Sequence, residues 1–178
     1  MPRQLALLRG INLASKRRVG MADLRRLLED AGHEEVRTHL QSGNVVLTSR
    51  LSPRKLEARL ERELSDALGF DVPVLVRTRA ALARIVAHDP LGPVASDPSR
   101  YVVSFLSKRL PAKVARELES ADVAPEQLAV HGRELYAWHP NGLQRSPLSK
   151  LLDDRKLGVV STARNWNTIV KLHELLER

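Results

Sequence analysis

The chain has 178 residues, and 29 lysines and arginines against 21 aspartates and glutamates give it a formal net charge of +8. Hydrophobic residues make up 43% of it, which is enough for a core, and no stretch is long and apolar enough to predict a membrane span. The lack of cysteine excludes disulfides and thiolate catalysis, and with no signal peptide in the sequence we expect a cytoplasmic protein. The basic excess suits anionic partners, although a solvated basic surface explains it equally well.

The first 78 residues alternate apolar strands with amphipathic helices. Leucines recur at helical spacing in two segments that end at Gly32 and Gly69, and Ser52 with Pro53 marks the start of the second helix. The predicted elements, in chain order, are a strand at 4–11, a basic loop at 12–20, a helix at 21–31, strands at 35–41 and 45–48 joined by a tight turn, a helix at 53–68 and a strand at 71–78.

This β-α-β-β-α-β order predicts a ferredoxin-like α-β plait with the spatial strand order 4-1-3-2. The first and third strands are apolar on both faces, as central strands should be, and the second alternates as an edge strand should. Pro73 falls in the predicted fourth strand, where an edge tolerates a missing donor. Because the central strands are apolar on both faces, we expect the helix-free face to be covered as well.

The second half repeats the order after a helix at 80–87 and a proline-rich link at 89–98. The further predicted elements are a strand at 101–107, a helix at 111–121, a hairpin of 127–131 and 134–138, a helix at 147–155, a short strand at 158–162 and a helix at 166–177. The expected fold is therefore α+β, with two ferredoxin-like plaits packed together and a C-terminal helix. The expected domains are 1–78 and 100–178, connected by 79–99.

Polar residues cluster where the first strand and the second-to-third hairpin would meet. In a plait, the end of the first strand lies beside this hairpin, and the basic loop leads into the start of a helix that favours anions. We therefore expect a phosphate or carboxylate site, although ordinary turn chemistry explains the same residues equally well. The candidate ligand-binding residues are Arg9, Asn12, Lys16, Arg17, Gln41, Ser42 and Asn44.

A further polar cluster opens the predicted last helix. Asn165 is expected to cap that helix, and Trp166 to pack with the apolar residues that follow it. Arg164 has no evident structural role in the sequence and could join the anion site. Asn167 and Lys171 share one helical face, so they complete the candidate set, although polar residues at a helix start are more often caps than ligands.

These motifs resemble those of the bacterial domain-of-unknown-function family 1697 (DUF1697). The resemblance rests on residues 7–12 with Lys16, on 41–45, and on 164–168 with Lys171, and so extends over the whole chain. It implies two intertwined or packed α-β plaits and supplies no catalytic residues. The chain departs from the family pattern at Ala14-Ser15, where a glycine pair is usual, which weakens a phosphate cradle made of backbone N–H groups.

The remaining patterns argue against several kinds of chemistry. The six histidines lack metal-ligand spacing, and His39 and His139 are expected to be exposed, so no metal or other cofactor is predicted. The predicted central strands of the first half carry no aromatic residue, which disfavours RNA binding on that sheet face. Tyr136 and Trp138 are expected in the core, with base stacking as the weaker alternative.

The function hypothesis is a cytoplasmic protein that binds a small anionic or phosphorylated ligand at 12–18 and 41–44. No set of residues indicates a reaction, which favours binding over catalysis. The alternatives are nucleic-acid-backbone binding by the basic loops and a protein-interaction module without a small ligand. Salt dependence separates the first alternative from the hypothesis, because contacts to many phosphates weaken steeply with salt.

Overall fold

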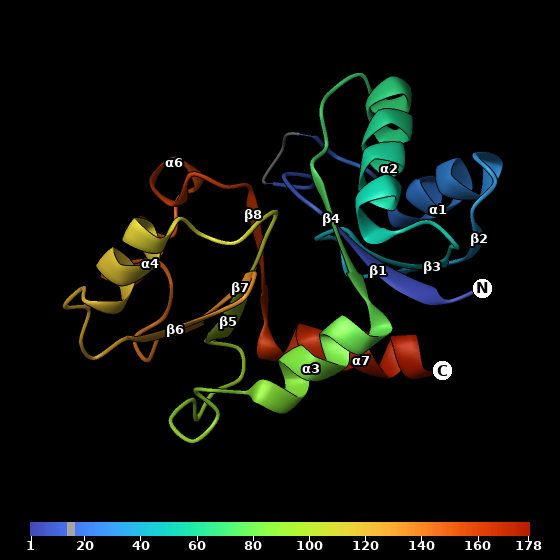
Figure 1. The fold of residues 1–178 in the computed structure, drawn as a ribbon. Coiled ribbons are helices and arrows are strands. Elements are labelled where there is room, and N and C mark those ends of the chain that lie inside the picture. Colours follow the sequence, from blue (N-terminus) through green and yellow to red (C-terminus); the bar gives the residue numbers. More distant parts are fainter. Residues whose placement is uncertain (14–16) are drawn as a thin grey trace. The chain divides into compact units, whose positions relative to one another are not determined.

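The computed structural model describes residues 1–13 and 17–178 (Figure 1). These residues form two four-stranded antiparallel sheets and seven helices, so the predicted α+β class is confirmed. The chain divides into two compact units: unit one is Met1–Arg84 with Lys171–Arg178, and unit two is Ile85–Val170. The limits between the units fall within α3 (Arg79–His88) and α7 (Trp166–Glu177). The predicted domain division at 79–99 stays a prediction.

Unit one is built on an antiparallel sheet with the strand order β2-β3-β1-β4. Its elements are β1 (Arg3–Leu8), α1 (Met21–Asp30), β2 (Glu34–His39), β3 (Asn44–Thr48), α2 (Pro53–Leu68) and β4 (Val74–Thr78). The register pairs Arg3 with Thr48 at one end of β1, and Leu7 with Asn44 towards the other. The loop after β1 and the β2–β3 hairpin therefore lie at the same end of the sheet.

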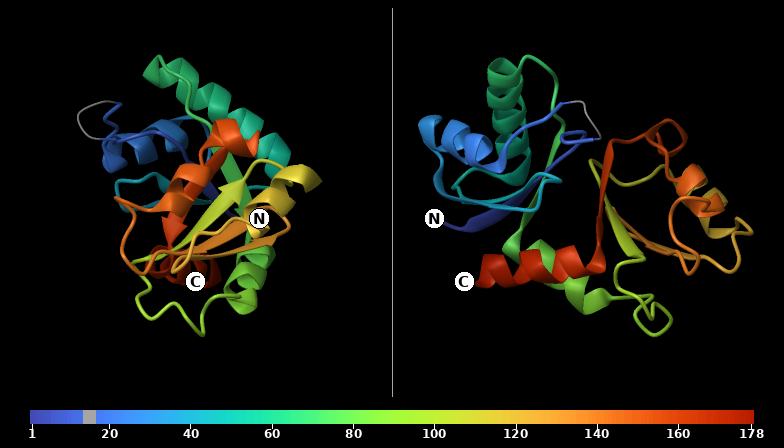
Figure 2. Two further views of the ribbon diagram at one scale, coloured as in Figure 1. Left: turned by 90° about the vertical axis from the view of Figure 1, so that its left-hand side faces the viewer. Right: turned by 180° about the vertical axis from the view of Figure 1, so that it is seen from behind.

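Both helices of this segment cover one face of the sheet, as Figure 2 shows. Leu24 and Leu28 of α1 are buried there, at the spacing of one helical turn that predicted the helix. Burying each leucine contributes about 2 kcal/mol, so the leucine stripes position α1 and α2 on the sheet. The buried leucines of α2 are Leu56, Leu60 and Leu64, and their sheet partners include Ala6, Leu8, Val45 and Leu47.

The central strands are buried on both faces, as their composition predicts. Leu5 and Leu7 point to the face opposite Ala6 and Leu8, and all four side chains are at most 2% exposed. The fourth strand is shorter than predicted, because it begins at Val74 and not at residue 71. Pro73 lacks an N–H for the sheet ladder, and only its carbonyl is used, accepting from the backbone N–H of Arg9 at 2.9 Å.

Unit two has a sheet with the corresponding order β6-β7-β5-β8. Leu118, Leu135 and Leu157 form part of its core. Tyr136 and Trp138 are buried, as predicted, and burial raises the pKa of Tyr136 above its usual range. The elements are β5 (Tyr101–Leu106), α4 (Ala112–Glu119), β6 (Gln127–His131), β7 (Glu134–Trp138), α5 (Pro147–Leu151), α6 (Asp154–Leu157) and β8 (Ser161–Asn165).

Two predictions for the end of unit two are wrong. The predicted helix at 147–155 is two short helices, because the Asp153 side chain accepts from the backbone N–H of Arg155 at 2.9 Å and begins a new helix there. The last strand is not 158–162 but Ser161–Asn165, since Gly158 adopts a left-handed conformation and ends α6. No helix among the described residues has both the length and the apolar character needed to cross a membrane.

Candidate functional site

The polar motifs of the first half form two loops at one end of the unit-one sheet. We call residues 9–13, 17–20 and 40–43 the strand-end loops. The first strand ends at Leu8, three residues earlier than predicted, because Gly10 and Asn12 have φ angles of 73° and 52° and turn the chain out of the sheet. The backbone N–H of Leu8 donates to the carbonyl of Gly43 at 2.8 Å, which holds the hairpin against the strand end.

Gly43 lets these two loops approach one another closely. Its φ is 79°, and a Cβ at this position would lie 2.8 Å from both Leu8 Cβ and Ile11 Cδ1. No side chain fits at that separation. The glycine of the hairpin motif is therefore required both by its backbone conformation and by the packing of the first motif against it.

Asn12 ties both loops together through its side-chain amide. Its Nδ2 donates to the carbonyl of Val19 at 2.9 Å and to the carbonyl of Gln41 at 2.8 Å. Its Oδ1 accepts from the backbone N–H of Val19 at 2.7 Å. Both donor hydrogens of the amide are thus used within the protein, so Asn12 shapes the loops and has no N–H left for a ligand.

Asn44 plays a similar part inside the hairpin. It is completely buried, and its Nδ2 donates to the carbonyl of His39 at 2.7 Å and to Ser42 Oγ at 3.0 Å. The side chain therefore holds the turn from within, while Gln41 and Ser42 are exposed on its outer surface. Of the hairpin candidates, these two are the ones that a ligand can reach.

The basic residues of the first loop lie at the surface beside this hairpin. Arg17 is exposed, its carbonyl accepts from the N–H of Asn12 at 2.9 Å, and its guanidinium carbon lies 5.2 Å from the ring centroid of Phe70. Arg9 is half-buried at the end of β1. Lys16, with Ala14 and Ser15, lies outside the described residues. The cation–π contact positions one candidate charge, that of Arg17.

The start of α1 contributes less to anion binding than the helix dipole alone suggests. Gly20 is the N-cap and supplies no side-chain hydrogen bond to the first turn. Asp23 lies in that turn, with one carboxylate oxygen 2.9 Å from where a Cβ on Gly20 would be. A carboxylate therefore already occupies the positive end of the helix, and recognition of an anion here depends on side chains.

Arg164 belongs to a strand and not to a helix start, which corrects the sequence prediction. It lies in β8 with 7% of its surface exposed, and its Nη1 donates to Thr162 Oγ1 at 2.8 Å and to the carbonyl of Ala163 at 2.7 Å. Burial lowers the pKa of Arg164 to about 10, so the group stays protonated at neutral pH. Arg164 is therefore a buried residue of unit two, which its sequence context did not indicate.

The other residues of this motif serve the last helix. Asn165 Oδ1 accepts from the backbone N–H of Thr168 at 3.0 Å, so the predicted cap is confirmed. Trp166 stacks on Tyr101, with 4.7 Å between ring centroids. Asn167 is exposed, and Lys171, which belongs to unit one, has its Nζ 2.9 Å from Glu174 Oε2.

Sequence reasoning missed a buried polar cluster in unit two. His139, predicted to be exposed, is completely buried, and its Nδ1 lies 2.8 Å from Glu126 Oε1 and 3.0 Å from Ser146 Oγ. Glu126 Oε2 also accepts from the backbone N–H of Leu148 at 2.8 Å. Burial raises the pKa of Glu126, but the hydrogen bonds from Ser146, His139 and Leu148 outweigh it and hold that pKa below its ordinary value.

No pattern in the sequence signals this cluster, because its three main members are 7 to 20 residues apart and belong to different elements. Its hydrogen bonds join the loop before β6 to the start of α5, which is a structural role. Across residues 1–13 and 17–178, no group of three or more acidic or histidine side chains could hold a metal ion.

The fold defines an α+β protein with two antiparallel sheets, whose first unit presents polar loops at one sheet end. The family model described as "Protein of unknown function (DUF1697)" matches residues 1–136, so the chain belongs to this family. A solved structure, that of the conserved bacterial protein SP0830 from Streptococcus pneumoniae, has a TM-score of 0.80 at 24% identity and covers 98% of both chains. That likeness shows the fold alone. No curated protein matches the chain, and no function is established for it.

Proposed function

We propose that the strand-end loops bind a small anionic or phosphorylated ligand. Arg17 supplies the positive charge, and Gln41 and Ser42 supply hydrogen bonds that orient the ligand. Asn12 and Asn44 hold the loops in shape from within. The observation that carries the proposal is the side-chain amide of Asn12. Two of its hydrogen bonds, both with Val19, close the first loop, and a third, to Gln41, joins that loop to the hairpin, which leaves exposed polar groups on the outer side of both loops.

Backbone conformation supports this proposal. Among the described residues, five residues other than glycine have a positive φ, and three of these, Asn12, Arg17 and Leu40, lie in the strand-end loops. Such conformations cost about 1–3 kcal/mol each and collect where a site needs a fixed shape. Leu40 is also 53% exposed, so packing of its side chain does not account for its conformation.

The positive charge of the first loop also supports the anion-binding proposal. Arg17 and Arg18 are exposed, and no ion pair with a carboxylate involves either of them in the described part of the chain. A guanidinium presents several N–H donors in a plane that matches phosphate and carboxylate oxygens. The contact with Phe70 limits the motion of the Arg17 side chain, so less conformational entropy is lost when an anion binds.

The proposal is tested by a thermal-shift panel of inorganic phosphate, nucleotides, sugar phosphates, carboxylates and short RNA and DNA, each at low and high salt. A compound present at a hundred times its Kd stabilises the protein by about 2.7 kcal/mol, which is readily measured. We expect a salt-tolerant shift with one class of small anion, lost in Arg17→Ala and kept in Arg50→Ala. Arg50 is an exposed arginine beyond β3, at the opposite end of the sheet.

Two results would overturn the proposal. Shifts with polynucleotides alone, disappearing at high salt, would assign the loops to nucleic-acid-backbone binding. Equal loss of the shift in Arg17→Ala and Arg50→Ala would show that overall charge and not the strand-end loops attracts the anion.

We also propose that each unit is a ferredoxin-like α-β plait and that the protein resides in the cytoplasm. The strand orders β2-β3-β1-β4 and β6-β7-β5-β8, with helical segments after the first and the third strand of each unit, support the first point. The lack of cysteine supports the second. An experimental structure and cell fractionation test them.

A further inference from the structure

The two sheets have four outer strands, β2 and β4 in unit one and β6 and β8 in unit two. An outer strand directs every second N–H and C=O away from its sheet, where a strand of another chain can pair with them. Proteins protect such edges with side chains that bond these groups, with charges or with irregular pairing. The hydrogen bonds along the four edges therefore show where a further strand can pair.

The edge of β4 is closed by side chains of α2 and of β4 itself. The backbone N–H of Val74 donates to Glu61 Oε1 at 2.9 Å. The N–H of Val76 donates to Glu57 Oε1 at 2.8 Å. The carbonyl of Val76 accepts from Arg77 Nη1 at 3.1 Å. These backbone groups of β4 are therefore already bonded inside unit one.

The edges of β8 and β2 are protected as well. In β8, the N–H of Ser161 donates to Asp154 Oδ1 at 3.2 Å. The carbonyl of Ala163 in the same strand accepts from Arg164 Nη1 at 2.7 Å. The strand β2, with the sequence EEVRTH, carries three charged residues, and its register with β3 shifts within the strand. Charges and an irregular register both oppose pairing with another strand.

The outward-facing residues of β6 are Leu128 and Val130. The N–H of Leu106 in β5 donates to the carbonyl of Arg133 at 2.9 Å, so this carbonyl faces β5. Backbone groups alternate in direction along a strand, and Leu135 therefore faces β5 too. Because the register pairs Val130 with Leu135, the backbone groups of Val130 and Leu128 point away from β7.

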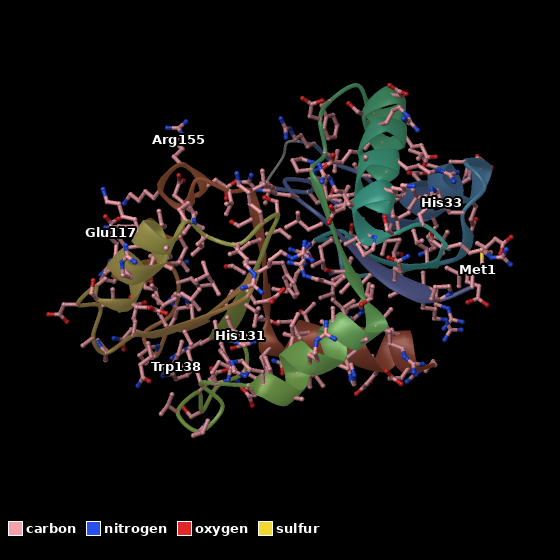
Figure 3. All side chains as sticks on the ribbon, viewed as in Figure 1. Met1, His33, Glu117, His131, Trp138 and Arg155 are labelled. Atoms are coloured by element: carbon pink, nitrogen blue, oxygen red, sulfur yellow. The ribbon has the colours of Figure 1, made fainter. Side chains whose placement is uncertain are left out.

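These outward groups are available to another strand. In the described part of the chain, no hydrogen bond uses the N–H or C=O of Leu128 or Val130. The strand has the sequence QLAVH, without lysine, arginine or carboxylate, and its register with β7 is regular. His131 and Trp138, labelled in Figure 3, mark the two ends of this hairpin. The edge of β6 thus lacks the devices that protect the other three.

We propose that β6 pairs with β6 of a second copy of this chain, antiparallel about a twofold axis at Ala129. In this register Leu128 lies opposite the second copy's Val130, and each such pair exchanges N–H···O bonds in both directions. The apolar side chains of these pairs meet on one face of the strands, and the two small Ala129 side chains meet on the other. At both ends the exposed Gln127 lies opposite the second copy's His131.

A second copy is the partner that this strand fits, because every pair it forms with itself is apolar or joins glutamine to histidine. Pairing of two short strands covers little area, so the association is weak and reversible. The proposal uses no residue of the strand-end loops, so it can hold or fail independently of anion binding.

Sedimentation equilibrium of the full chain, at concentrations up to millimolar, tests the proposal. We expect dimers that dissociate on dilution. Val130→Pro removes the outward N–H, so each copy loses one intermolecular hydrogen bond and dimerisation should weaken at least about fivefold. The sheet of unit two keeps its own hydrogen bonds in this variant, because an outward N–H of an edge strand can be replaced by proline.

Thr38→Pro is the matched control in unit one. The carbonyl of Gly43 accepts from β1 as that of Arg133 accepts from β5, so Thr38, which pairs with Val45, also faces outward. The control variant should dimerise as the wild type does.

Ala129 gives a second test that does not depend on proline. Ala129→Asp and Ala129→Lys each place like charges on both sides of the twofold axis, so each variant alone should dimerise less than the wild type. An equimolar mixture brings opposite charges together and should form more dimer than either variant alone.

A wild-type chain that stays monomeric up to millimolar concentration would overturn the proposal and leave β6 to a strand of another protein. Equal weakening by Thr38→Pro and Val130→Pro would do the same, as would a mixture of the Ala129 variants that forms no more dimer than either alone. If Val130→Pro does not fold, the mixture decides.

Discussion

The side chain of Asn12 donates a hydrogen bond to the carbonyl of Gln41 at 2.8 Å and so joins two loops that are 29 residues apart in the chain. The same amide holds both the N–H and the carbonyl of Val19. One residue thereby closes the first loop and attaches it to the hairpin. The shape of the candidate site therefore depends on this residue.

Replacing Asn12 should therefore destabilise unit one. We expect Asn12→Ala to lower the free energy of unfolding by about 2–4 kcal/mol, since three hydrogen bonds are lost and alanine is strained at a φ of 52°. Asn12→Gly loses the same bonds without that strain, so it should be less harmful by about 1 kcal/mol. Urea denaturation measures both differences, and an unchanged midpoint for Asn12→Ala would contradict the structural role.

The close approach at Gly43 leads to a second prediction. Gly43→Ala should destabilise the protein by about 2–4 kcal/mol, because the new Cβ would lie 2.8 Å from Leu8 and Ile11 in addition to the cost of the left-handed conformation. Gly69→Ala is the matched control, with a φ of 75° and no atom within 4 Å of the new Cβ. It should cost only about 1 kcal/mol. Equal midpoints of urea unfolding for both variants would mean that the packing against Leu8 is unimportant.

The ring of Phe70 should assist anion binding through Arg17. We expect Phe70→Leu to weaken binding of the anion identified in the thermal-shift panel by about two- to fivefold, because the cation–π contact contributes about 0.5–1 kcal/mol to holding the guanidinium in place. In an Arg17→Ala background the same change should have no further effect. Calorimetric titration of the four proteins tests this coupling, and additive losses would argue against it.

The stability of unit two should depend on pH through Glu126. Its pKa in the folded state is held below the ordinary value of 4.5, so its contribution is present at neutral pH and is lost as the pH falls through the lowered pKa. Glu126→Gln should cost about 2 kcal/mol at neutral pH, since charged hydrogen bonds are lost, and less in acid. Unfolding curves measured from pH 7 down to about pH 3 test this dependence.

Glu119→Gln at the exposed end of α4 is the control for this experiment and should be neutral throughout. A Glu126→Gln deficit that stays constant down to about pH 3 would show that the carboxylate does not titrate as the structure requires.

Much of the secondary structure could be predicted because it depends on local patterns. Leu56, Leu60 and Leu64 recur every four residues, and such a stripe forms a helix wherever it finds a core to pack against. The end of unit two could not be predicted in the same way. There Gly158 ends a short helix and β8 extends through Arg164, because pairing with β5 decides the limits of a strand that has little apolar character of its own.

The residues of the candidate site could be predicted from the sequence. Which of them hold the loops in shape and which stay open to a ligand could not. The sequence indicates that the segments 9–12 and 41–44 lie close together. It does not show that the amide N–H groups of Asn12 and Asn44 donate to other groups of the protein. That depends on atoms from distant segments lying within 3 Å of one another. For the same reason, the burial of His139 beside Glu126 has no sequence signal.

The sequence by itself determined the α+β class, the helix and strand order and the location of the polar loops, because periodicity, glycines and caps act within a few residues. Only the tertiary structure decided which polar side chains stay available to a ligand. Gln41 and Asn44 carry the same amide group, and whether that group is still available to a ligand depends on the neighbours that the fold provides.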